Sequence, residues 1–458
     1  MLTYELKKSP GVPLYEALYR CIRGDILSGN LAPGQKLPSK RALAQNLEVS
    51  KITVETAYNQ LLSEGYIRAA EKIGYFVEDI PQTAAQIPAI SAAAETPPAR
   101  PVLDLTGSGT EKFPFSVWSR LQREVMLDYG EKLLLPLHNQ GIEPLRRAIA
   151  DHLHAFRAMA VDPENILIGA GTDFLYNLLI QLLGRDKTYA VEDPGYGKIH
   201  KIYAAGGVKC ISVPMDHEGV LPQKLMDARV LHLSPAHHFP TGLVTSVPRR
   251  QELLSWAKSC GGYIIEDDYD SEFRFDAHPK PTMQSLDRSG RVIYMNTFSK
   301  SLAPSIRISY MVLPPELMAA FRRNLGFYSC TVSSFEQYTL ARFLSRGYFE
   351  KHINRMRKYY KMRRNQVVSA LNRCAFSDKL TIREEDAGLH FLLKVDTHLT
   401  DEELVRFCES KDIRVRALSS YYHLSVPKGD EHCLVINYAG LNQEDLEHVL
   451  ARWDGLPE

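Results

Sequence analysis

The stretch "DIPQTAAQIPAISAAAETPPARP", residues 79–101, constrains the fold of this chain more than any other feature. It is rich in alanine and proline and has no sustained helical or strand period, which is the composition of an extended, semi-rigid tether. A chain of 458 residues is also too long for one core of ordinary size. We therefore expect two separately folded parts, residues 1–78 and residues 102–458, joined by a linker.

The composition is that of a globular protein and identifies no partner by itself. Hydrophobic residues make up 45% of the chain, and 55 Lys and Arg nearly balance 54 Asp and Glu, so bulk charge indicates no polyanion. The chain lacks a signal-peptide pattern and an apolar run long enough for a membrane. Seven scattered cysteines without a C-x-x-C pair favour free thiols over a zinc or disulfide framework. We expect a cytoplasmic protein with no membrane partner and no metal site.

The first part has the pattern of three helices followed by a β-hairpin. Apolar residues recur at helical spacing over residues 14–27. Ser39 and Ser50 are suited to cap two further helices, and Gly65 ends the last of them. Residues 66–77 contain two strand-like runs around a polar turn. We expect the third helix to bury a largely inward face made of Ile52, Val54, Ala57, Leu61 and Leu62.

Two short helices joined by a tight turn form a helix-turn-helix, whose second helix enters the major groove of DNA. Lys40 and Arg41 begin the second helix and Lys51 begins the third, where they are placed to meet phosphates. The following hairpin would be a wing. A three-helix domain with a purely structural role is the alternative. Three polar side chains of the third helix are candidates for contacts with base edges: Thr53, Thr56 and Asn59.

The run "LPSKRALAQNLEVSKITVETAYNQLLSEGYI" resembles the winged helix-turn-helix of GntR-type transcription regulators, whose pattern is roughly L-P-S-x-R-x-L-A-x-x-L-x-V-S-R-x-T-V. The resemblance covers most of residues 12–78 and departs at Lys51, where that pattern usually has arginine. It implies that double-stranded DNA is a partner, with Arg41, Lys51 and Thr53 at DNA-contacting positions.

The second part contains four motifs in a fixed order, and the first two contain a glycine-bearing turn and a tyrosine. In "ILIGAGTDFLYNLLIQLL" a strand leads through Gly169, Gly171 and Thr172 into a helix. Small residues at such a turn let backbone N–H groups approach a phosphate at the helix N-terminus. In "AVEDPGYGKIH" Tyr196 follows a Pro-Gly bend and could present its ring to a flat ligand. A core tyrosine is the alternative for that position.

The third and fourth motifs contain carboxylates and an amine. In "GGYIIEDDYDSEFRF" an apolar run ends in acidic residues, at the strand end where open α/β sheets bind ligands; metal coordination is the alternative. In "YMNTFSKSLAPSIRISY" Lys300 lies among small polar residues. A buried lysine loses its proton easily and can attack an aldehyde, whereas Ser299 and Arg307 suit a phosphate. The alternative is that Lys300 is a partly buried lysine in a salt bridge.

A phosphate turn, a stacking ring, a carboxylate and an amine are the parts that a pyridoxal phosphate pocket requires. In this order they resemble the fold-type I aminotransferases over about residues 102–458. The resemblance implies an α/β fold with a mainly parallel central sheet and a smaller C-terminal α/β subdomain. Its implied cofactor is pyridoxal 5'-phosphate.

The resemblance also implies a role for each matching residue. Lys300 would bond to the cofactor aldehyde and Asp267 would pair with the ring nitrogen. Tyr269 would bond to the ring hydroxyl oxygen and Tyr196 would stack on the ring. The run "SPAHHFPTG", with His237, His238 and Pro240, is similar to the stretch that meets the ring from the other side. The phosphate would be held by the turn and by the fourth motif, through Gly171, Thr172, Ser299 and Arg307.

A GntR-like winged helix joined by a long linker to an aminotransferase-like domain resembles the MocR/GabR subfamily of regulators. This likeness implies a homodimer, an operator with repeated half-sites, and an effector that is pyridoxal phosphate, an amine or an amino acid. We expect no net enzymatic turnover, although a half-reaction is compatible with the pocket. An aminotransferase with an accessory DNA-binding domain is one alternative, and a cofactor-free dimerisation scaffold is another.

One departure bears on the ligand. Relatives that bind amino acids often read "L-R-L-G" near the C-terminus, whereas this chain reads "CLVINYAGL" with Val435 at the arginine position. Valine cannot bind an α-carboxylate. Either Arg414, Arg416 or Lys198 supplies the cation, or the ligand carries no such carboxylate.

Overall fold

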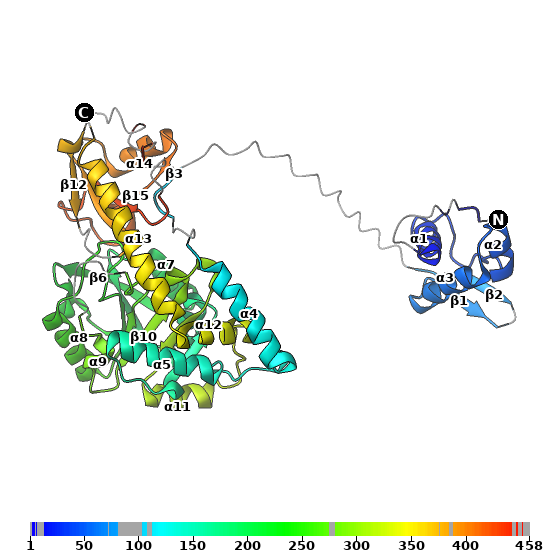
Figure 1. Cartoon of the computed structure of the whole chain (residues 1–458), viewed down its shortest axis with the longest axis horizontal. Helices are drawn as coiled ribbons and strands as arrows, with labels where there is room; N and C mark the ends of the chain where they lie inside the picture. The colour runs from blue at the N-terminus through cyan, green and yellow to red at the C-terminus, as the bar shows by residue number, and fades with distance from the viewer. Residues whose placement is uncertain are drawn as a thin grey trace. The chain divides into compact units, whose positions relative to one another are not determined.

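The structure is a computed structural model in which the chain forms two compact units, Met1–Pro98 and Ala99–Glu458 (Figure 1). The linker expected over residues 79–101 lies outside the described residues from residue 81 onward, so its extended form stays a prediction. Within the described stretches, no helix is long and apolar enough to cross a membrane. The structure describes residues 2–4, 6, 13–71, 73–80, 103–107, 112–273, 280–374, 376–383, 388–441, 446–447 and 451.

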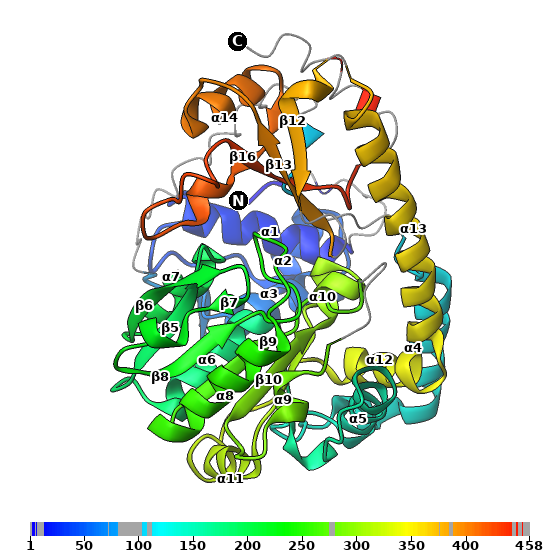
Figure 2. The ribbon, with the colours of Figure 1, turned by 90° about the vertical axis from the view of Figure 1, so that its left-hand side faces the viewer.

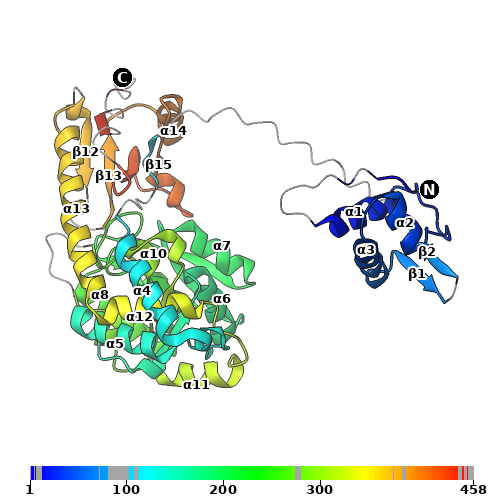
Figure 3. The same cartoon turned by 45° about the vertical axis from the view of Figure 1, so that its right-hand side comes forward.

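In the described residues of the first unit, three helices are followed by an antiparallel hairpin. Figure 3 shows the hairpin beside the third helix, and its register pairs Ile67 with Val77. This arrangement is a helix-turn-helix with a wing, as expected from the sequence. The elements are α1 (Leu14–Leu27), α2 (Lys40–Asn46), α3 (Lys51–Ser63), β1 (Ile67–Ala70) and β2 (Gly74–Val77).

Side-chain caps and one apolar face explain these helices. The Ser39 and Ser50 hydroxyls accept the N–H groups of Ala42 and Thr53 at the starts of α2 and α3, which satisfies donors that have no partner within the helix. The expectation that Ile52 points inward is wrong, because its side chain is 73% exposed. The buried face of α3 is Val54, Ala57, Tyr58 and Leu61. At 100° per residue, position 52 lies about 200° from position 54 and therefore on the opposite side.

The second unit is built on an eight-stranded sheet in the order β4-β11-β10-β9-β8-β5-β6-β7. Of these eight strands, β11 and β7 run against the others, so the central sheet is mainly parallel, as expected. Figure 2 shows β8, β9 and β10 side by side. The strands are β4 (Ile166–Gly169), β5 (Thr188–Asp193), β6 (Lys209–Asp216), β7 (Gly219–Val220), β8 (Ala228–Leu233), β9 (Tyr263–Asp267), β10 (Val292–Thr297) and β11 (Ser309–Val312).

Helices cover both faces of this sheet. Ile265 and Ile293 pack in one core with residues of α6 and α11, whereas Ile264 and Val292 pack in another core with residues of α8. Successive strand residues point to opposite faces, which explains why β9 and β10 are continuously apolar. The helices of this unit up to α11 are α4 (Phe115–Tyr129), α5 (Glu143–Arg157), α6 (Thr172–Leu183), α7 (Gly197–Ala205), α8 (Val247–Cys260), α9 (Met283–Leu286), α10 (Phe298–Ser301) and α11 (Pro315–Asn324).

A smaller subdomain follows, with an antiparallel sheet in the order β12-β13-β16-β15. The short strands β3 and β14 form a separate parallel pair. The remaining helices are α12 (Ser334–Ser345), α13 (Tyr348–Leu371) and α14 (Asp401–Ser410). The strands are β3 (Leu103–Asp104), β12 (Leu380–Arg383), β13 (His390–Val395), β14 (Ile413–Arg414), β15 (Arg416–Ala417) and β16 (Cys433–Asn437).

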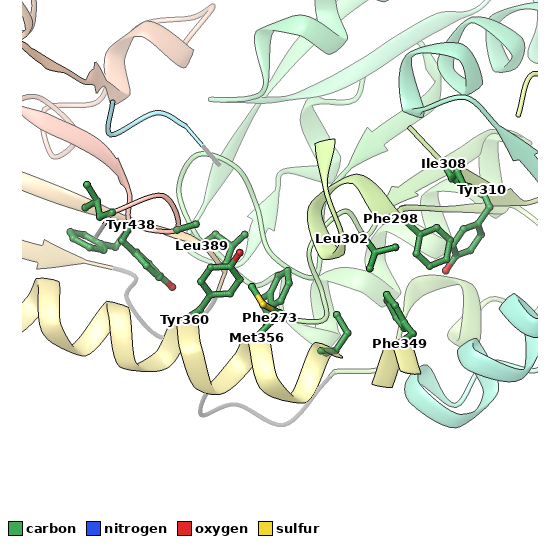
Figure 4. Close-up of a cluster of buried hydrophobic side chains, with 14 of the residues drawn as sticks. Phe273, Phe298, Leu302, Ile308, Tyr310, Phe349, Met356, Tyr360, Leu389 and Tyr438 are labelled. Carbon is green, nitrogen blue, oxygen red and sulfur yellow. The ribbon is translucent and has the colours of Figure 1, made fainter. Parts of the chain in front are cut away.

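One apolar core runs from the large sheet along α13 into the smaller subdomain (Figure 4). Phe298 packs against Phe349 in a T-shaped contact, and Phe273 does the same with Tyr360. Phe298 and Leu302, both buried in this core, flank Lys300 in the chain. The core therefore anchors the turn that presents Lys300.

Candidate cofactor and effector site

A cavity of about 510 Å³ lies where parallel strands of the large sheet end. Its walls include the last residues of β9 and β10, Asp267 and Thr297, and Ser234, which follows β8. The carboxyl ends of parallel strands are the usual ligand site of open α/β sheets, and the volume is in the range that holds a small ligand.

The structure gathers most of the residues that the sequence predicted for a cofactor site. One predicted residue, Gly171, is not among the residues that line the cavity. It is the N-cap of α6 and has a φ of 90°. A Cβ added there would lie 2.4 Å from Nη2 of Arg307, so glycine lets the guanidinium approach the turn. The predicted residues that line the cavity are Thr172, Tyr196, Asp267, Tyr269, Ser299, Lys300 and Arg307.

Lys300 lies in α10, just after β10 ends. Its side chain is accessible to solvent through the cavity, yet the surrounding protein desolvates the ammonium group and lowers its pKa, an effect that the charge of Asp270 partly opposes. A lowered pKa increases the fraction of neutral amine, which is the form that attacks a carbonyl.

Asp267 has one carboxylate oxygen that accepts a hydrogen bond and one without a partner. Its Oδ2 accepts a hydrogen bond from the Tyr176 hydroxyl and lies 3.5 Å from Nε2 of His232. Its Oδ1 is buried and finds no hydrogen-bond partner among the described residues. A buried carboxylate oxygen without a donor is costly, which indicates a ligand N–H at this position.

Tyr269 and the histidines near it form a second group. The Tyr269 hydroxyl lies 3.3 Å from Nδ1 of His237, and the same ring nitrogen lies 2.8 Å from Asp270. Burial, with the nearby charge of Asp270, raises the pKa of Tyr269. Neither His237 nor His238 is among the residues that line the cavity, whereas Phe239 and His232 are.

The phosphate-suited residues surround the start of α6. Arg307 Nη2 lies 3.4 Å from Oδ2 of Asp173, and Lys198 Nζ lies 2.6 Å from the same oxygen. The Ser299 hydroxyl is buried, and the described part of the structure gives it no hydrogen-bond partner. A phosphate at this turn would accept a hydrogen bond from the Ser299 hydroxyl. It would also accept hydrogen bonds from Arg307, which contacts Asp173 as well.

These features fit pyridoxal phosphate. The unpartnered Asp267 Oδ1 suits a protonated ring nitrogen, and Ser299, Arg307 and the Gly171 turn suit a phosphate. The amine of Lys300 in the same cavity suits an aldehyde.

Sequence reasoning missed three buried residues of this site. Tyr176 lies four residues after Thr172, so helical spacing alone could have placed it beneath the turn. His232 lies within the apolar strand β8, and its Nδ1 is 2.7 Å from the Tyr203 hydroxyl. Glu192 is the next-to-last residue of the buried strand β5, and its side chain accepts a hydrogen bond from the N–H of Ser234 at 2.8 Å. A polar residue inside an apolar strand was the available signal for both.

The structure distinguishes among the predicted DNA-contacting residues of the first unit. Arg41 and Lys51 are exposed at the starts of α2 and α3. Lys40 instead forms an ion pair with Glu55 at 2.8 Å and lies over the Tyr75 ring, so it links α2 to α3 and the wing. Thr53 is half-buried, and its hydroxyl lies 2.8 Å from that of Ser50. Thr56 and Asn59, the other candidates on α3 for contacts with base edges, are exposed.

The chain matches two known families in succession. Residues 14–77 match the bacterial regulatory proteins of the gntR family, and residues 106–452 match the aminotransferases of class I and II. The second match covers most of the chain.

Several curated proteins are similar along nearly the whole length. The uncharacterized HTH-type transcriptional regulator YdeL of Bacillus subtilis is 36% identical, over 98% of each chain. The probable rhizopine catabolism regulatory protein MocR of Rhizobium meliloti is 33% identical, over 96% of this chain and 93% of that protein. The HTH-type pyridoxine biosynthesis transcriptional regulator PdxR of Corynebacterium glutamicum is 31% identical, over 94% and 93%.

Solved structures share the fold of the second unit. The kynurenine aminotransferase of Pyrococcus horikoshii has a TM-score of 0.67 at 24% identity, over 77% of this chain and 90% of that one. The α-aminoadipate aminotransferase LysN of Thermus thermophilus has a TM-score of 0.65 at 23% identity, over 77% and 90%. At these identities the likeness establishes the fold.

Proposed function

Because the chain belongs to the MocR/GabR subfamily of GntR-type transcription regulators, we propose that it controls transcription in response to a small ligand bound at the cavity around Lys300. The observation that carries this proposal is the cavity itself, which holds an amine, an unpartnered carboxylate oxygen and a phosphate-suited turn. An aminotransferase with an accessory DNA-binding domain is disfavoured, because the relatives that span the whole chain are regulators.

Pyridoxal 5'-phosphate supplies an aldehyde that condenses with primary amines and a ring that withdraws electrons from them. Asp267 would hold a proton on the ring nitrogen through Oδ1, while Tyr176 fixes its other oxygen. Lys300 would provide the amine that holds the aldehyde. Further residues would bind the remaining groups: Tyr196 and Tyr269 at the ring, and Gly171, Thr172, Ser299 and Arg307 at the phosphate.

The effector is the cofactor itself or a primary amine that reaches it. The named relatives point to different metabolites, since one is a pyridoxine biosynthesis regulator and another a rhizopine catabolism regulator. Ligand binding changes DNA binding only if it favours one arrangement of the protein over another. A differential binding free energy of about 1–3 kcal/mol is sufficient for such coupling.

We also propose that the protein works as a homodimer in the cytoplasm on an operator with direct or inverted repeats. Support comes from α4 and the short helix Gly130–Leu134 that follows it, where large apolar side chains are exposed to solvent. Exposed apolar surface of this kind marks an interaction site, and a second copy of the chain would present the same residues. These side chains are Phe115, Met126, Leu127, Leu134 and Leu135.

The test combines the visible spectrum with DNA binding. Purified protein supplied with pyridoxal phosphate should show a yellow absorption band that the Lys300→Ala variant lacks. The wild-type protein should bind its own promoter region, with an affinity that falls steeply as salt increases.

If no band forms at saturating cofactor, the cavity does not bind pyridoxal phosphate and the second unit serves only for dimerisation. Repeated conversion of an amino acid and a keto acid would instead support the aminotransferase.

A further inference from the structure

We propose that Arg416 binds an acidic group of the effector, and that the effector is therefore a small primary amine that carries a carboxylate. This inference rests on the proposed function and specifies the ligand of the same cavity. The smaller subdomain forms one wall of the cavity, and Arg416 and Val435 both belong to that wall.

Val435 removes the cation that the resemblance implies at this wall. Its side chain is 4% exposed and packs in a small apolar cluster with Leu392, Leu418 and Tyr421. Valine offers no hydrogen-bond donor, so position 435 contributes only apolar contact. If an acidic ligand binds here, another residue supplies the positive charge.

The sheet register places Arg416 beside that position. β15 and β16 are antiparallel, and Arg416 and Val435 are directly paired. Paired residues of an antiparallel sheet project from the same face with Cβ atoms about 5 Å apart. The Arg416 side chain therefore leaves the sheet on the adjacent strand, directly beside position 435.

The other candidate cations are already engaged. Lys198 and Arg307 lie 2.6 Å and 3.4 Å from the same oxygen of Asp173. Arg414 lies 3.1 Å from Asp104 and is not among the residues that line the cavity.

Arg416 differs from all three. Across the described ranges, no carboxylate lies within ion-pair distance of its guanidinium. The group lies beside the Tyr421 hydroxyl, where its charge partly offsets the rise that burial causes in the pKa of that phenol. A cavity-lining guanidinium without a carboxylate partner has its fork of donors available for an oxyanion.

Aromatic contacts hold this wall in place. Tyr421 packs edge-on against Phe239 with ring centroids 5.2 Å apart, and Phe239 packs against Tyr196 at 5.9 Å. These three rings line the same cavity as Lys300 and Arg416. A ligand would direct its amine toward Lys300 and its acidic group toward Arg416. The cavity would therefore select ligands that carry both groups, as a zwitterionic amino acid does.

The experiment uses the full-length protein with bound pyridoxal phosphate and follows the cofactor absorption band during titration. Each ligand in the panel is an α- or ω-amino acid, and each is matched with its neutral amide. For the wild-type protein, at least one amino acid should shift the band at a concentration about tenfold or more below that needed for its amide. The Arg416→Gln variant should bind that amino acid about ten- to a hundredfold more weakly, the effect of one lost charge-assisted contact, while its binding of the amide changes little.

Two further variants make the test specific. Arg414→Gln changes an exposed arginine two positions away and should leave both ligands unaffected. The double variant Arg416→Gln with Val435→Arg moves the guanidinium to the adjacent strand and should restore discrimination between acid and amide.

The outcomes separate the two proposals. If the wild-type protein forms no cofactor band, the proposed function fails. If the band forms but amides bind as well as amino acids, if no amine in the panel shifts the band, or if Arg416→Gln binds amino acids as tightly as the wild type, the inference about Arg416 is overturned.

Discussion

Asp267 shows how neighbouring residues prepare one side chain for a ligand. Tyr176 and His232 surround Oδ2, and Oδ1 remains for a partner that the chain itself does not supply. Tyr203 contacts His232 in turn, at 2.7 Å. A chain of buried polar groups thus lies on the Oδ2 side of the carboxylate and fixes its orientation before a ligand binds.

Replacing Tyr176 with phenylalanine should weaken cofactor binding by about tenfold, because the carboxylate loses a hydrogen bond of the charged type. Titration of the absorption band with pyridoxal phosphate measures this affinity. Tyr189→Phe is the matched control, since that hydroxyl contacts the carbonyl of Gly184 and does not line the cavity. Equal affinities for Tyr176→Phe and the wild type would show that Tyr176 does not position Asp267.

Glu192 and His238 form a buried pair, and their shifted pKa values make both side chains neutral near pH 7. Burial raises the pKa of Glu192 to about 8, to which the charge of Asp267 contributes. Burial lowers the pKa of His238 to about 3, and the two side chains lie 3.6 Å apart. Near neutral pH, the folded protein therefore keeps a proton on Glu192 that the unfolded chain releases.

This proton makes stability depend on pH in a defined direction. The contribution of Glu192 is fully present below its ordinary pKa of 4.5 and is lost as the pH rises through about 8. His238 acts in the opposite direction, mainly below its ordinary value of 6.5. Burial also raises the pKa of Glu272, to about 7, so this carboxyl adds a slope of the same sign as Glu192 up to about that pH. Glu192 therefore dominates the dependence between pH 7 and pH 8. There the free energy of unfolding should fall by up to about 1.4 kcal/mol per pH unit because of Glu192.

Urea unfolding of the cofactor-free protein at several pH values measures this effect. All three tryptophans lie in the part after residue 101, so their fluorescence reports the second unit. The Glu192→Gln variant is neutral at every pH and should show a flatter dependence than the wild type. Parallel curves for the two proteins would mean that Glu192 is ionised in the folded state.

At the scale of single elements, α3 illustrates which features are encoded locally. Its start is set by Ser50, whose hydroxyl accepts the N–H of Thr53 at 3.1 Å, and its buried face by the 3.6-residue period. Both signals lie within a few residues, so the sequence was sufficient to predict this helix. The error at Ile52 came from counting apolar residues without their angular phase.

Ser50→Ala should destabilise the start of α3 by about 1 kcal/mol, which corresponds to about fivefold faster amide exchange over residues 51–63. Hydrogen-exchange mass spectrometry of the full-length protein measures it. Ser50→Asp retains an oxygen acceptor at the cap and should keep protection close to that of the wild type. Unchanged exchange in Ser50→Ala would show that the cap contributes nothing.

The candidate site was predictable only in part, for a related reason. Lys300 and Asp267 occur in short polar runs at strand ends, where sequence and topology together indicate a ligand. Arg416 became distinguishable from Arg414 only through the pairing of β15 with β16, which is a contact between distant segments. Tyr176 and His232 likewise reach Asp267 from separate elements. Such contacts depend on tertiary packing and leave no local pattern.

At the scale of the whole molecule, the exposed apolar residues of α4 and the following helix predict self-association. Leu127 and Leu134 are 78% and 73% exposed. Replacing both with aspartate should convert a dimer to monomers, because each charge would be buried against an apolar surface. Light scattering coupled to size-exclusion chromatography measures the mass.

The same variant should bind a two-half-site operator no better than a single half-site, because linkage between two DNA-binding units is lost. Met226→Asp is the control, since Met226 is 75% exposed and lies outside this segment. A Leu127→Asp, Leu134→Asp variant that remains dimeric would place the interface elsewhere.

We propose above all that occupation of the cavity around Lys300 changes DNA binding by the other unit. Its most direct test is the affinity of the full-length protein for its own promoter region, measured by fluorescence anisotropy at fixed salt with and without saturating pyridoxal phosphate, alone and with the amine panel. At least one of these additions should change Kd by about 5- to 150-fold. Lys300→Ala should abolish the change while keeping the affinity of the ligand-free protein. An identical Kd under every condition would contradict it.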